Sequence, residues 1–265
     1  MATEWLRGKT VIVTGASGGI GRHIAREVAK RGANTIIIAR QLDKLMRLKA
    51  EIDMQFDVDV HPFALDIEDM AAVKETFEAI KLNWPTVDGL VNNAGFGIFD
   101  YFTEASLEDM KKMFEVNVLG MMAATRMMLP KMLQQGEGHI INIASIAGKL
   151  ATPKSSVYAA TKSAVIGFSN GLRMEVAGKG VMVTVVNPGP IKTNFFRVAD
   201  PEGTYTANVA RWMIEPERVA EKVAAAFGTK KREVNLPLLM STGARLYQLF
   251  PGFVEKVAGR MLNKK

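Results

Sequence analysis

Seven short strand-like runs, separated by segments of helical periodicity, constrain the fold of this chain more than any other feature. Continuous runs of valine and isoleucine are typical of parallel strands that are buried on both faces. Strands that alternate with helices form βαβ units, whose right-handed crossovers place helices on both faces of one sheet. The runs lie at 10–13, 35–38, 60–65, 89–92, 138–145, 181–186 and 233–236.

The helical segments follow from the spacing of apolar residues and from capping signals. Ser106 and Asp109 look like a capping pair for a long helix that runs to Pro130. No linker, repeat or low-complexity tract interrupts the pattern, so we expect one α/β domain over residues 1–265 with a doubly wound, seven-stranded, largely parallel sheet. The other helices are expected at 20–31, 42–52 and 70–80, and from Ser155 or Ser156 onward.

The composition excludes several classes of function. Apolar residues make up 48% of the 265 residues, which is enough for a substantial core. The absence of cysteine excludes disulfides, thiolate metal sites and cysteine nucleophiles, and we expect no metal ion. The net charge is +7, but the basic residues are scattered, which favours a solvated surface over nucleic-acid binding. No signal peptide or membrane-spanning stretch is apparent, so we expect a cytoplasmic protein.

A glycine-rich turn joins the first strand to the first long helix. Gly15, Gly18, Gly19 and Gly21 fall within seven residues. Glycines allow the positive φ angles of a tight turn and let a pyrophosphate approach the backbone. The helix N-terminus adds free N–H groups and a positive dipole end for that anion. The alternative is a turn used only for chain reversal, which would not require so many glycines.

The end of the second strand bears on the choice of dinucleotide. A carboxylate at this place accepts hydrogen bonds from the ribose 2′-hydroxyl of NAD. The chain has Ala39 and Arg40 instead, and an arginine can bind a 2′-phosphate with two parallel hydrogen bonds. We therefore expect NADP(H); the alternative is a solvated Arg40 that binds no ligand.

Tyr158 and Lys162 lie four residues apart, so they share one face of the helix that follows Ser155. A phenol beside an ammonium group can exchange a proton with a substrate oxygen, and the cation would lower the phenol pKa. Ser145 ends the preceding strand, where its hydroxyl could hold a carbonyl oxygen. Asn117 is a poor helix former within a long helix, a mismatch that hints at function. Taken alone, the Tyr158–Lys162 pair would be more typical of an ordinary amphipathic helix.

These motifs, in this order, resemble the short-chain dehydrogenase/reductase family over essentially the whole chain, and with it a Rossmann fold. The likeness is closest to a bacterial branch of mostly uncharacterised oxidoreductases, through the stretches 93–99 and 139–145. The motifs are Thr14-Gly-Ala-Ser-Gly-Gly-Ile-Gly21, Leu65-Asp66, Asn92-Asn-Ala-Gly95, Asn117, Ser145, Tyr158-Ala-Ala-Thr-Lys162 and Pro188-Gly-Pro-Ile-Lys-Thr193.

The resemblance implies a role for each matching residue. Tyr158 would be the general acid and base, and Lys162 would bind the nicotinamide ribose and lower the Tyr158 pKa. Ser145 would orient the substrate oxygen, and Asn117 would hold a water in a proton relay to Lys162. The cofactor would contact Gly15, Ser17, Gly18, Gly19, Ile20, Gly21, Arg40, Asp66 at the adenine, Asn93 and Ala94 at the adenosine ribose, Gly95, Pro188, Gly189, and Ile191 and Thr193 at the carboxamide.

One position departs from the pattern of NADPH-preferring members. Many of them carry a basic residue inside the glycine turn, where this chain has Gly18. Arg40 is then the main candidate for the 2′-phosphate. The family's subunit contacts also imply a homodimer or homotetramer, by analogy alone.

The resemblance implies an NADPH-dependent reduction of a carbonyl to an alcohol, or the reverse. One alternative is a non-catalytic NADP(H)-binding redox sensor, which would not need Ser145, Tyr158 and Lys162 together. Another is a nucleotide-sugar epimerase or dehydratase, for which the chain lacks room for the larger substrate domain.

Two segments at the end of the chain bear on the substrate. Aromatic residues crowd a lid at about 194–215, and they either line an apolar pocket or pack the lid on the core. Residues from about 237 to 265 form a basic amphipathic extension that Pro251 divides. This extension would either lie on an anionic membrane surface or pack against the domain or a second subunit.

Overall fold

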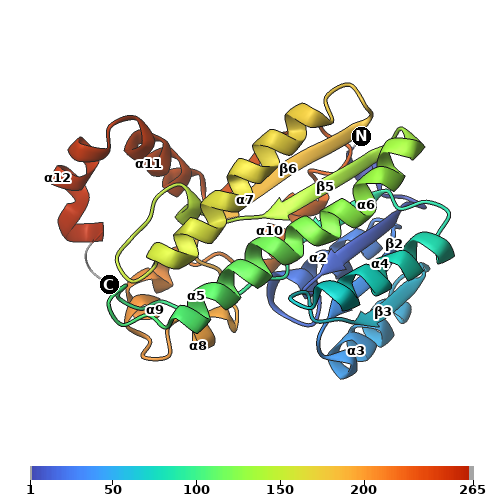
Figure 1. The fold of residues 1–265 in the computed structure, drawn as a ribbon, viewed down its shortest axis with the longest axis horizontal. Coiled ribbons are helices and arrows are strands. Elements are labelled where there is room, and N and C mark those ends of the chain that lie inside the picture. The colour runs from blue at the N-terminus through green and yellow to red at the C-terminus, as the bar shows by residue number, and fades with distance from the viewer. Residues whose placement is uncertain (1, 263–265) are drawn as a thin grey trace.

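The computed structural model describes residues 2–262, which form a seven-stranded sheet with helices on both faces (Figure 1). Every strand pair is parallel, and the strand order is β3-β2-β1-β4-β5-β6-β7. This confirms the predicted fold class. The strands are β1 (Thr10–Thr14), β2 (Asn34–Ala39), β3 (Val60–Ala64), β4 (Gly89–Asn92), β5 (Gly138–Ile143), β6 (Val181–Pro188) and β7 (Glu233–Leu236).

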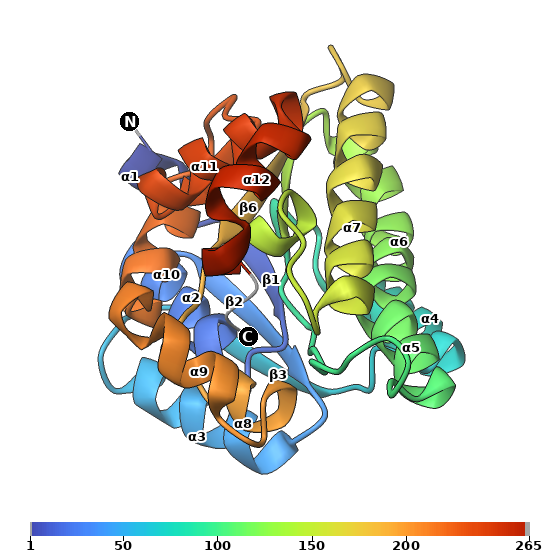
Figure 2. The ribbon, with the colours of Figure 1, turned by 90° about the vertical axis from the view of Figure 1, so that its left-hand side faces the viewer.

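The helices cover the sheet in two layers. One layer contains α2 (Gly19–Lys30), α3 (Leu42–Asp53) and α10 (Pro216–Ala224); the other contains α4 (Met70–Asn83), α6 (Met121–Gln135) and α7 (Ser156–Glu175). Figure 2 shows the two layers on opposite sides of the strands. The remaining helices are α1 (Ala2–Trp5), α5 (Leu107–Phe114), α8 (Phe195–Ala199), α9 (Thr204–Val209), α11 (Leu238–Leu249) and α12 (Pro251–Leu262).

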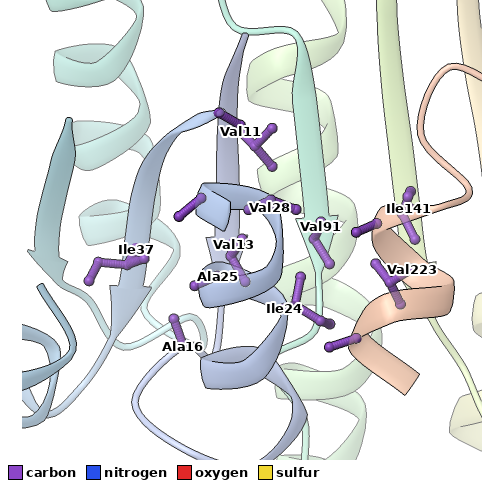
Figure 3. Close-up of a cluster of buried hydrophobic side chains, with 14 of the residues drawn as sticks. Val11, Val13, Ala16, Ile24, Ala25, Val28, Ile37, Val91, Ile141 and Val223 are labelled. Carbon is purple, nitrogen blue, oxygen red and sulfur yellow. The ribbon is translucent and has the colours of Figure 1, made fainter. Parts of the chain in front are cut away.

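The two faces of the sheet have separate apolar cores because side chains alternate along a strand. On β1, Val11 and Val13 join the core beneath α2 and α10, whereas Ile12 joins the core beneath α4 and α6. Figure 3 shows Ile24 and Val28 of α2 over the first of these cores. These side chains are fully buried, which is the pattern expected of parallel strands covered on both faces.

The strand order reverses at β1. The connection from β1 leads outward to β2 and β3, and the connection from β3 returns to β4 on the other side of β1. The crossovers therefore leave the carboxyl ends of β1 and β4 in opposite directions. In open parallel sheets, ligands bind in the crevice that this reversal opens.

The helix predicted from Ser106 to Pro130 differs from the prediction at two places. Ser106 does cap it, since its Oγ accepts hydrogen bonds from the N–H groups of Glu108 and Asp109. The middle, Glu115–Gly120, is a π-helix, and the helix then continues as α6 through Pro130 to Gln135. Pro130 removes one donor without ending the helix, which stops at Gly136, where φ is +66°.

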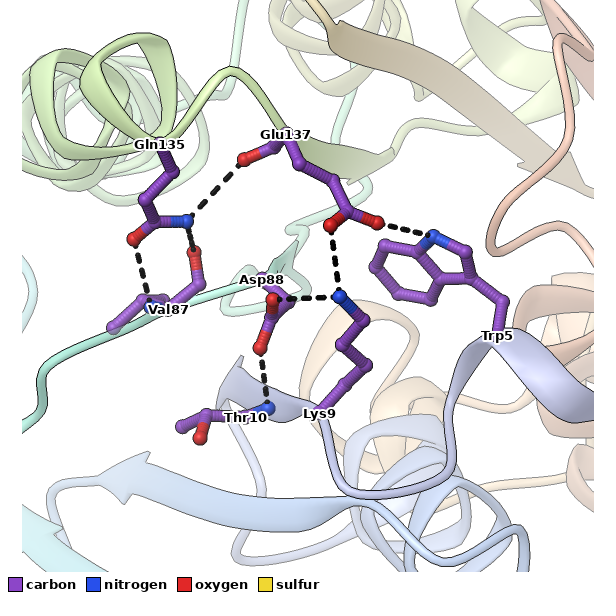
Figure 4. Close-up of polar contacts among 7 residues, drawn as sticks. All are labelled: Trp5, Lys9, Thr10, Val87, Asp88, Gln135 and Glu137. Carbon is purple, nitrogen blue, oxygen red and sulfur yellow. Dashed lines mark hydrogen bonds and ion pairs between the residues drawn. The ribbon is translucent and has the colours of Figure 1, made fainter.

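The amino-terminal ends of the strands are joined by a polar network centred on Lys9 (Figure 4). Its Nζ lies 2.8 Å from an Oε of Glu137 and 3.2 Å from an Oδ of Asp88. The second Asp88 oxygen accepts a hydrogen bond from the Thr10 N–H at 2.8 Å, and Glu137 accepts one from the Trp5 indole at 3.0 Å. The network therefore ties β1, β4 and β5 together at the end of the sheet opposite the crevice.

His139 of β5 is fully buried and neutral. Its Nδ1 accepts a hydrogen bond from the Gly228 N–H, and its Nε2 lies 2.9 Å from Oγ1 of Thr184. The Thr184 hydroxyl donates to the Lys231 carbonyl, so it is free to accept from Nε2–H. A proton on Nδ1 would face the Gly228 donor, and burial lowers the pKa of His139 to about 3.

Acid is therefore expected to destabilise the protein through His139. The folded-state pKa lies below the ordinary value of 6.5, so below that pH the unfolded chain binds a proton that the folded protein does not. Between pH 6.5 and 5, this group should remove about 2 kcal/mol from the free energy of unfolding. Urea unfolding at pH 7.5 and 5.0 should show a correspondingly smaller loss in His139→Gln. Equal pH dependence of the two proteins would contradict the assignment.

Candidate active site

A cavity of about 1310 Å³ opens at the carboxyl ends of the central strands. It extends from the glycine turn after β1, past the ends of β4, β5 and β6, to the lid at 194–215. Most residues predicted to bind cofactor or substrate lie in its wall. These are Gly15, Ser17, Gly18, Gly19, Ile20, Arg40, Asp66, Asn93, Ala94, Gly95, Ser145, Tyr158, Lys162, Pro188, Gly189, Ile191 and Thr193.

The glycine turn fits the pyrophosphate of a dinucleotide. Gly15 and Gly19 have φ angles of +69° and +52°, which residues with a side chain rarely adopt. Gly18, the N-cap of α2, provides no side-chain cap, and a Cβ there would meet no atom within 4 Å. The amino terminus of α2 therefore faces the cavity with its N–H groups available to an anion.

Gly21 does not line the cavity, unlike Gly15, Gly18 and Gly19, and its contact with the cofactor stays a prediction. A Cβ at Gly21 would lie 2.3 Å from the Gly15 carbonyl oxygen and 2.4 Å from Nδ2 of Asn93. That Asn93 amide donates to the Thr14 and Gly15 carbonyls at 2.9 and 3.2 Å. Gly21 thus permits the close packing of α2, the turn and β4 that shapes the phosphate end.

Arg40 and Asp66 stand at the far end of the cavity, after β2 and β3. The Arg40 side chain is 68% exposed, and its Nη1 lies 3.9 Å from an Oδ of Asp66. This separation is a weak surface ion pair, which leaves the guanidinium able to turn towards a ligand. The arrangement is compatible with binding a phosphate at this end of the cavity.

Ser145, Tyr158 and Lys162 converge at the other end. Tyr158 and Lys162 are both buried on α7, and Lys162 Nζ lies 5.7 Å from the centre of the Tyr158 ring. Lys162 donates a hydrogen bond to the Ile143 carbonyl at 3.1 Å. The Ser145 hydroxyl accepts from the Ala147 N–H at 3.1 Å and lies 3.3 Å from the Pro188 carbonyl. The predicted proton-transfer group is therefore assembled at one place.

The pKa of Tyr158 moves in the direction opposite to the prediction. Burial raises it well above the ordinary value near 10, and hydrogen bonding with Ser145 opposes this only in part. Lys162 is buried too, and burial lowers its pKa to about 8, so its ammonium is still protonated at neutral pH. The expected lowering of the Tyr158 pKa is thus wrong, because desolvation of the phenolate dominates.

Asn117 lies in the π-helix behind the cavity wall. Its Oδ1 accepts from the Phe96 N–H at 2.9 Å, and its Nδ2 donates to the Phe96 carbonyl at 2.8 Å and to Oγ1 of Thr161 at 3.1 Å. These bonds hold the loop after β4 against α7. The mismatch between asparagine and a regular helix coincides with this π-helix; the water relay through Asn117 stays a prediction.

The aromatic residues of the lid both line the cavity and pack the lid against the core, which were the two alternatives that the sequence left open. Phe195, Phe196 and Tyr205 line the cavity, and they also pack edge-on around Phe99. Phe99 in turn lies 5.6 Å from Tyr158 between ring centres. The rings therefore form an apolar wall of the cavity beside the Tyr158 ring.

Sequence reasoning missed the contribution of α11. Leu239, Met240 and Gly243 belong to the cavity wall, although they lie in the extension beyond the last strand. Met240 reaches the site at Gly189, where an added Cβ would lie 2.9 Å from its sulfur. No local motif marks these residues, so only the folded arrangement could identify them.

A buried ion pair supports the Ser145 loop from beneath, and it too was missed. Lys149 follows the short helix after Ser145, and its side chain is 7% exposed. It pairs with Glu233 of β7 and donates to Oδ1 of Asn235 at 3.2 Å. The Asn235 oxygen also accepts from Asn187 at 2.8 Å. The network joins β6, β7 and the Ser145 loop.

Comparison with known proteins agrees with this geometry. The short chain dehydrogenase family model matches residues 9–202. The uncharacterised oxidoreductase YbbO of Escherichia coli is 33% identical, with 96% of each chain covered. The NADP-dependent 3-hydroxy acid dehydrogenase of Schizosaccharomyces pombe is 33% identical over 86% of this chain and 90% of its own length.

A solved structure shows the same fold with its ligands bound. L-Sorbose reductase from Gluconobacter frateurii, complexed with NADPH and L-sorbose, is 28% identical with a TM-score of 0.78. The match covers 87% of this chain and 95% of that one. The matched sequence, the parallel sheet and the cavity at its reversal point together show that this chain belongs to the short-chain dehydrogenases, oxidoreductases that bind a nicotinamide cofactor.

Proposed function

We propose that the protein is an NADPH-dependent oxidoreductase that interconverts a carbonyl and an alcohol on a hydrophobic substrate. The observation that carries the proposal is the shared cavity. It has the glycine turn and Arg40 at one end, and Tyr158, Lys162 and Ser145 under an aromatic lid at the other. A nicotinamide cofactor would supply the hydride, and the protein supplies position and proton transfer.

The roles of the catalytic side chains follow from their environments. Burial keeps the Tyr158 hydroxyl protonated at neutral pH, so it can donate a proton to a carbonyl oxygen. Ser145 lies within reach of the same oxygen and would orient it. Lys162 carries its charge at neutral pH and would hold the nicotinamide ribose next to Tyr158.

The preference for NADPH rests on Arg40. It occupies the place after β2 where a carboxylate would accept from a free ribose hydroxyl, and its side chain is exposed to the cavity end. The names of the Schizosaccharomyces pombe relative and of the L-sorbose reductase complex also refer to the phosphorylated cofactor.

Arg40→Asp is expected to weaken NADPH binding by about 10–100-fold, because a charge-assisted hydrogen bond contributes roughly 1.5–3 kcal/mol. NADH binding should change little. Fluorescence titration of both cofactors measures the effect, with Arg47→Asp as the control, since Arg47 is an exposed arginine of α3 outside the cavity wall. Equal losses for NADPH and NADH in Arg40→Asp would remove the assignment.

The hydrophobic substrate is supported by the aromatic wall around Tyr158. NADPH oxidation should be followed with short polar ketones, long-chain ketones, 3-oxoacyl thioesters and steroids. We expect turnover with members of the apolar classes. Activity confined to small polar ketones would contradict the substrate class. NADPH binding without turnover of any compound would favour the redox sensor instead.

A further inference from the structure

The last two helices carry exposed apolar side chains. α11 and α12 stand away from the sheet on the same side of the molecule as α8 and α9 (Figures 1 and 2). Their exposed apolar side chains range from 45% exposure at Leu246 to 79% at Leu238. The set is Leu238, Leu239, Leu246, Leu249, Phe250, Phe253 and Val257.

The spacing places some of these side chains on a common face within each helix. Leu239 and Leu246 share a face of α11 with Gly243 between them, and Phe253 and Val257 share a face of α12, after the break at Phe250. The opposite face of α11 packs on the domain through Ser241 and Ala244, which are buried. Leu239 and Gly243 also line the cavity, so the exposed apolar side chains of α11 adjoin the cavity wall.

The charge of residues 238–265 favours a negatively charged surface over a second copy of this protein as the partner of α11 and α12. Residues 238–265 contain one acidic residue, Glu255, whose carboxylate accepts a hydrogen bond from the Tyr247 hydroxyl at 3.1 Å. A second copy of the same face would bring like charges together, whereas a negative surface would neutralise them. The basic residues of the segment are Arg245, Lys256, Arg260, Lys264 and Lys265.

The lengths of α11 and α12 decide whether these helices could cross a lipid bilayer or only lie on its surface. α11 and α12 have 12 residues each, about 18 Å of helix, which is too short for a hydrocarbon core of about 30 Å. None of the helices among residues 2–262 has the length and apolar character needed to span a bilayer. Short helices with an apolar face and basic residues bind in the plane of a membrane surface.

We propose that α11 and α12 dock on the surface of an anionic lipid bilayer, with their exposed apolar side chains in the acyl boundary and with Arg245 and Lys256 at the headgroups. This docking places the mouth of the cavity beside the bilayer. The proposed docking depends only on α11 and α12 and does not depend on the identity of the substrate.

Co-sedimentation of the full-length protein with vesicles tests the proposal. We expect binding to phosphatidylglycerol vesicles, weak binding to phosphatidylcholine vesicles, and a loss of binding in high salt. The double variant Phe250→Ser/Phe253→Ser should bind at least about 10-fold more weakly, since it removes two large, exposed apolar side chains that would enter the bilayer. Leu82→Ser is the matched control, because Leu82 of α4 is 86% exposed in a separate part of the fold.

Three results would overturn the proposal. The first is no binding of the full-length protein to phosphatidylglycerol vesicles. The second is equal binding of the double variant and the wild type. The third is a shift of the double variant to a smaller oligomer in sedimentation velocity without a change in vesicle binding, which would identify these side chains as a contact between copies. Thermal unfolding of each variant shows whether the domain itself is intact.

Discussion

Tyr158→Phe is expected to lower kcat by about 10²–10⁴-fold, the contribution typical of a positioned general acid. The substitution removes the hydroxyl and keeps the ring that packs between Phe99 and Phe195. The fold and NADPH binding should therefore persist. Steady-state NADPH oxidation with any substrate found by the screen measures kcat, and fluorescence titration measures the Kd for NADPH.

Tyr205→Phe is the matched control for this experiment. Tyr205 belongs to the same aromatic cluster, and burial raises its pKa to about 12. It lines the cavity from α9 and not from α7, which carries Lys162, so removing its hydroxyl should change kcat by less than about 10-fold. Normal turnover in Tyr158→Phe would show that another group transfers the proton.

Gly21→Ala is expected to have the second large effect, on stability. The added methyl would lie 2.3 Å from the Gly15 carbonyl oxygen and 2.4 Å from Nδ2 of Asn93, which follows β4. Overpacking of this kind costs roughly 1–3 kcal/mol and displaces backbone atoms. Because the displaced atoms belong to the phosphate turn, cofactor affinity should fall together with the free energy of unfolding.

Gly18→Ala is the matched control, because it places an alanine in the same turn without the steric contact expected at Gly21. Gly18 has an extended backbone, and an added Cβ would meet no atom within 4 Å. Urea unfolding should show little change in Gly18→Ala and a clear loss in Gly21→Ala. Equal stability of the two variants would mean that the turn relaxes around the extra methyl at Gly21.

The sheet could be predicted from the sequence because the apolar runs that favour strands are also the segments that the fold buries on both faces. The valine and isoleucine runs of β1 and β2 are the strands of a sheet covered on both faces, and Gly15 and Gly19 adopt the positive φ angles for which glycine is suited. The order of the motifs also indicated one site for Ser145, Tyr158 and Lys162, since Ser145 follows the end of β5 and the next helix, α7, carries the other two near its start.

What the sequence could not predict depends on contacts between distant segments. The Tyr158 pKa rises because Phe99 and Phe195 enclose the ring, and no spacing along the chain reports that desolvation. Asn117 lies in the π-helix at Glu115–Gly120, and its side chain accepts a hydrogen bond from the Phe96 N–H in the loop after β4. The contribution of α11 to the cavity wall depends on how the chain turns after β7.

The position of α11 in the chain has a consequence for synthesis. The ribosome makes the glycine turn, Ser145, Tyr158 and Lys162 before it makes Leu239, Met240 and Gly243, which complete the wall. A chain that stops before residue 238 would contain Ser145, Tyr158 and Lys162, yet the wall of its cavity would lack the residues of α11. The wall of the cavity is therefore complete only after α11 has been synthesised.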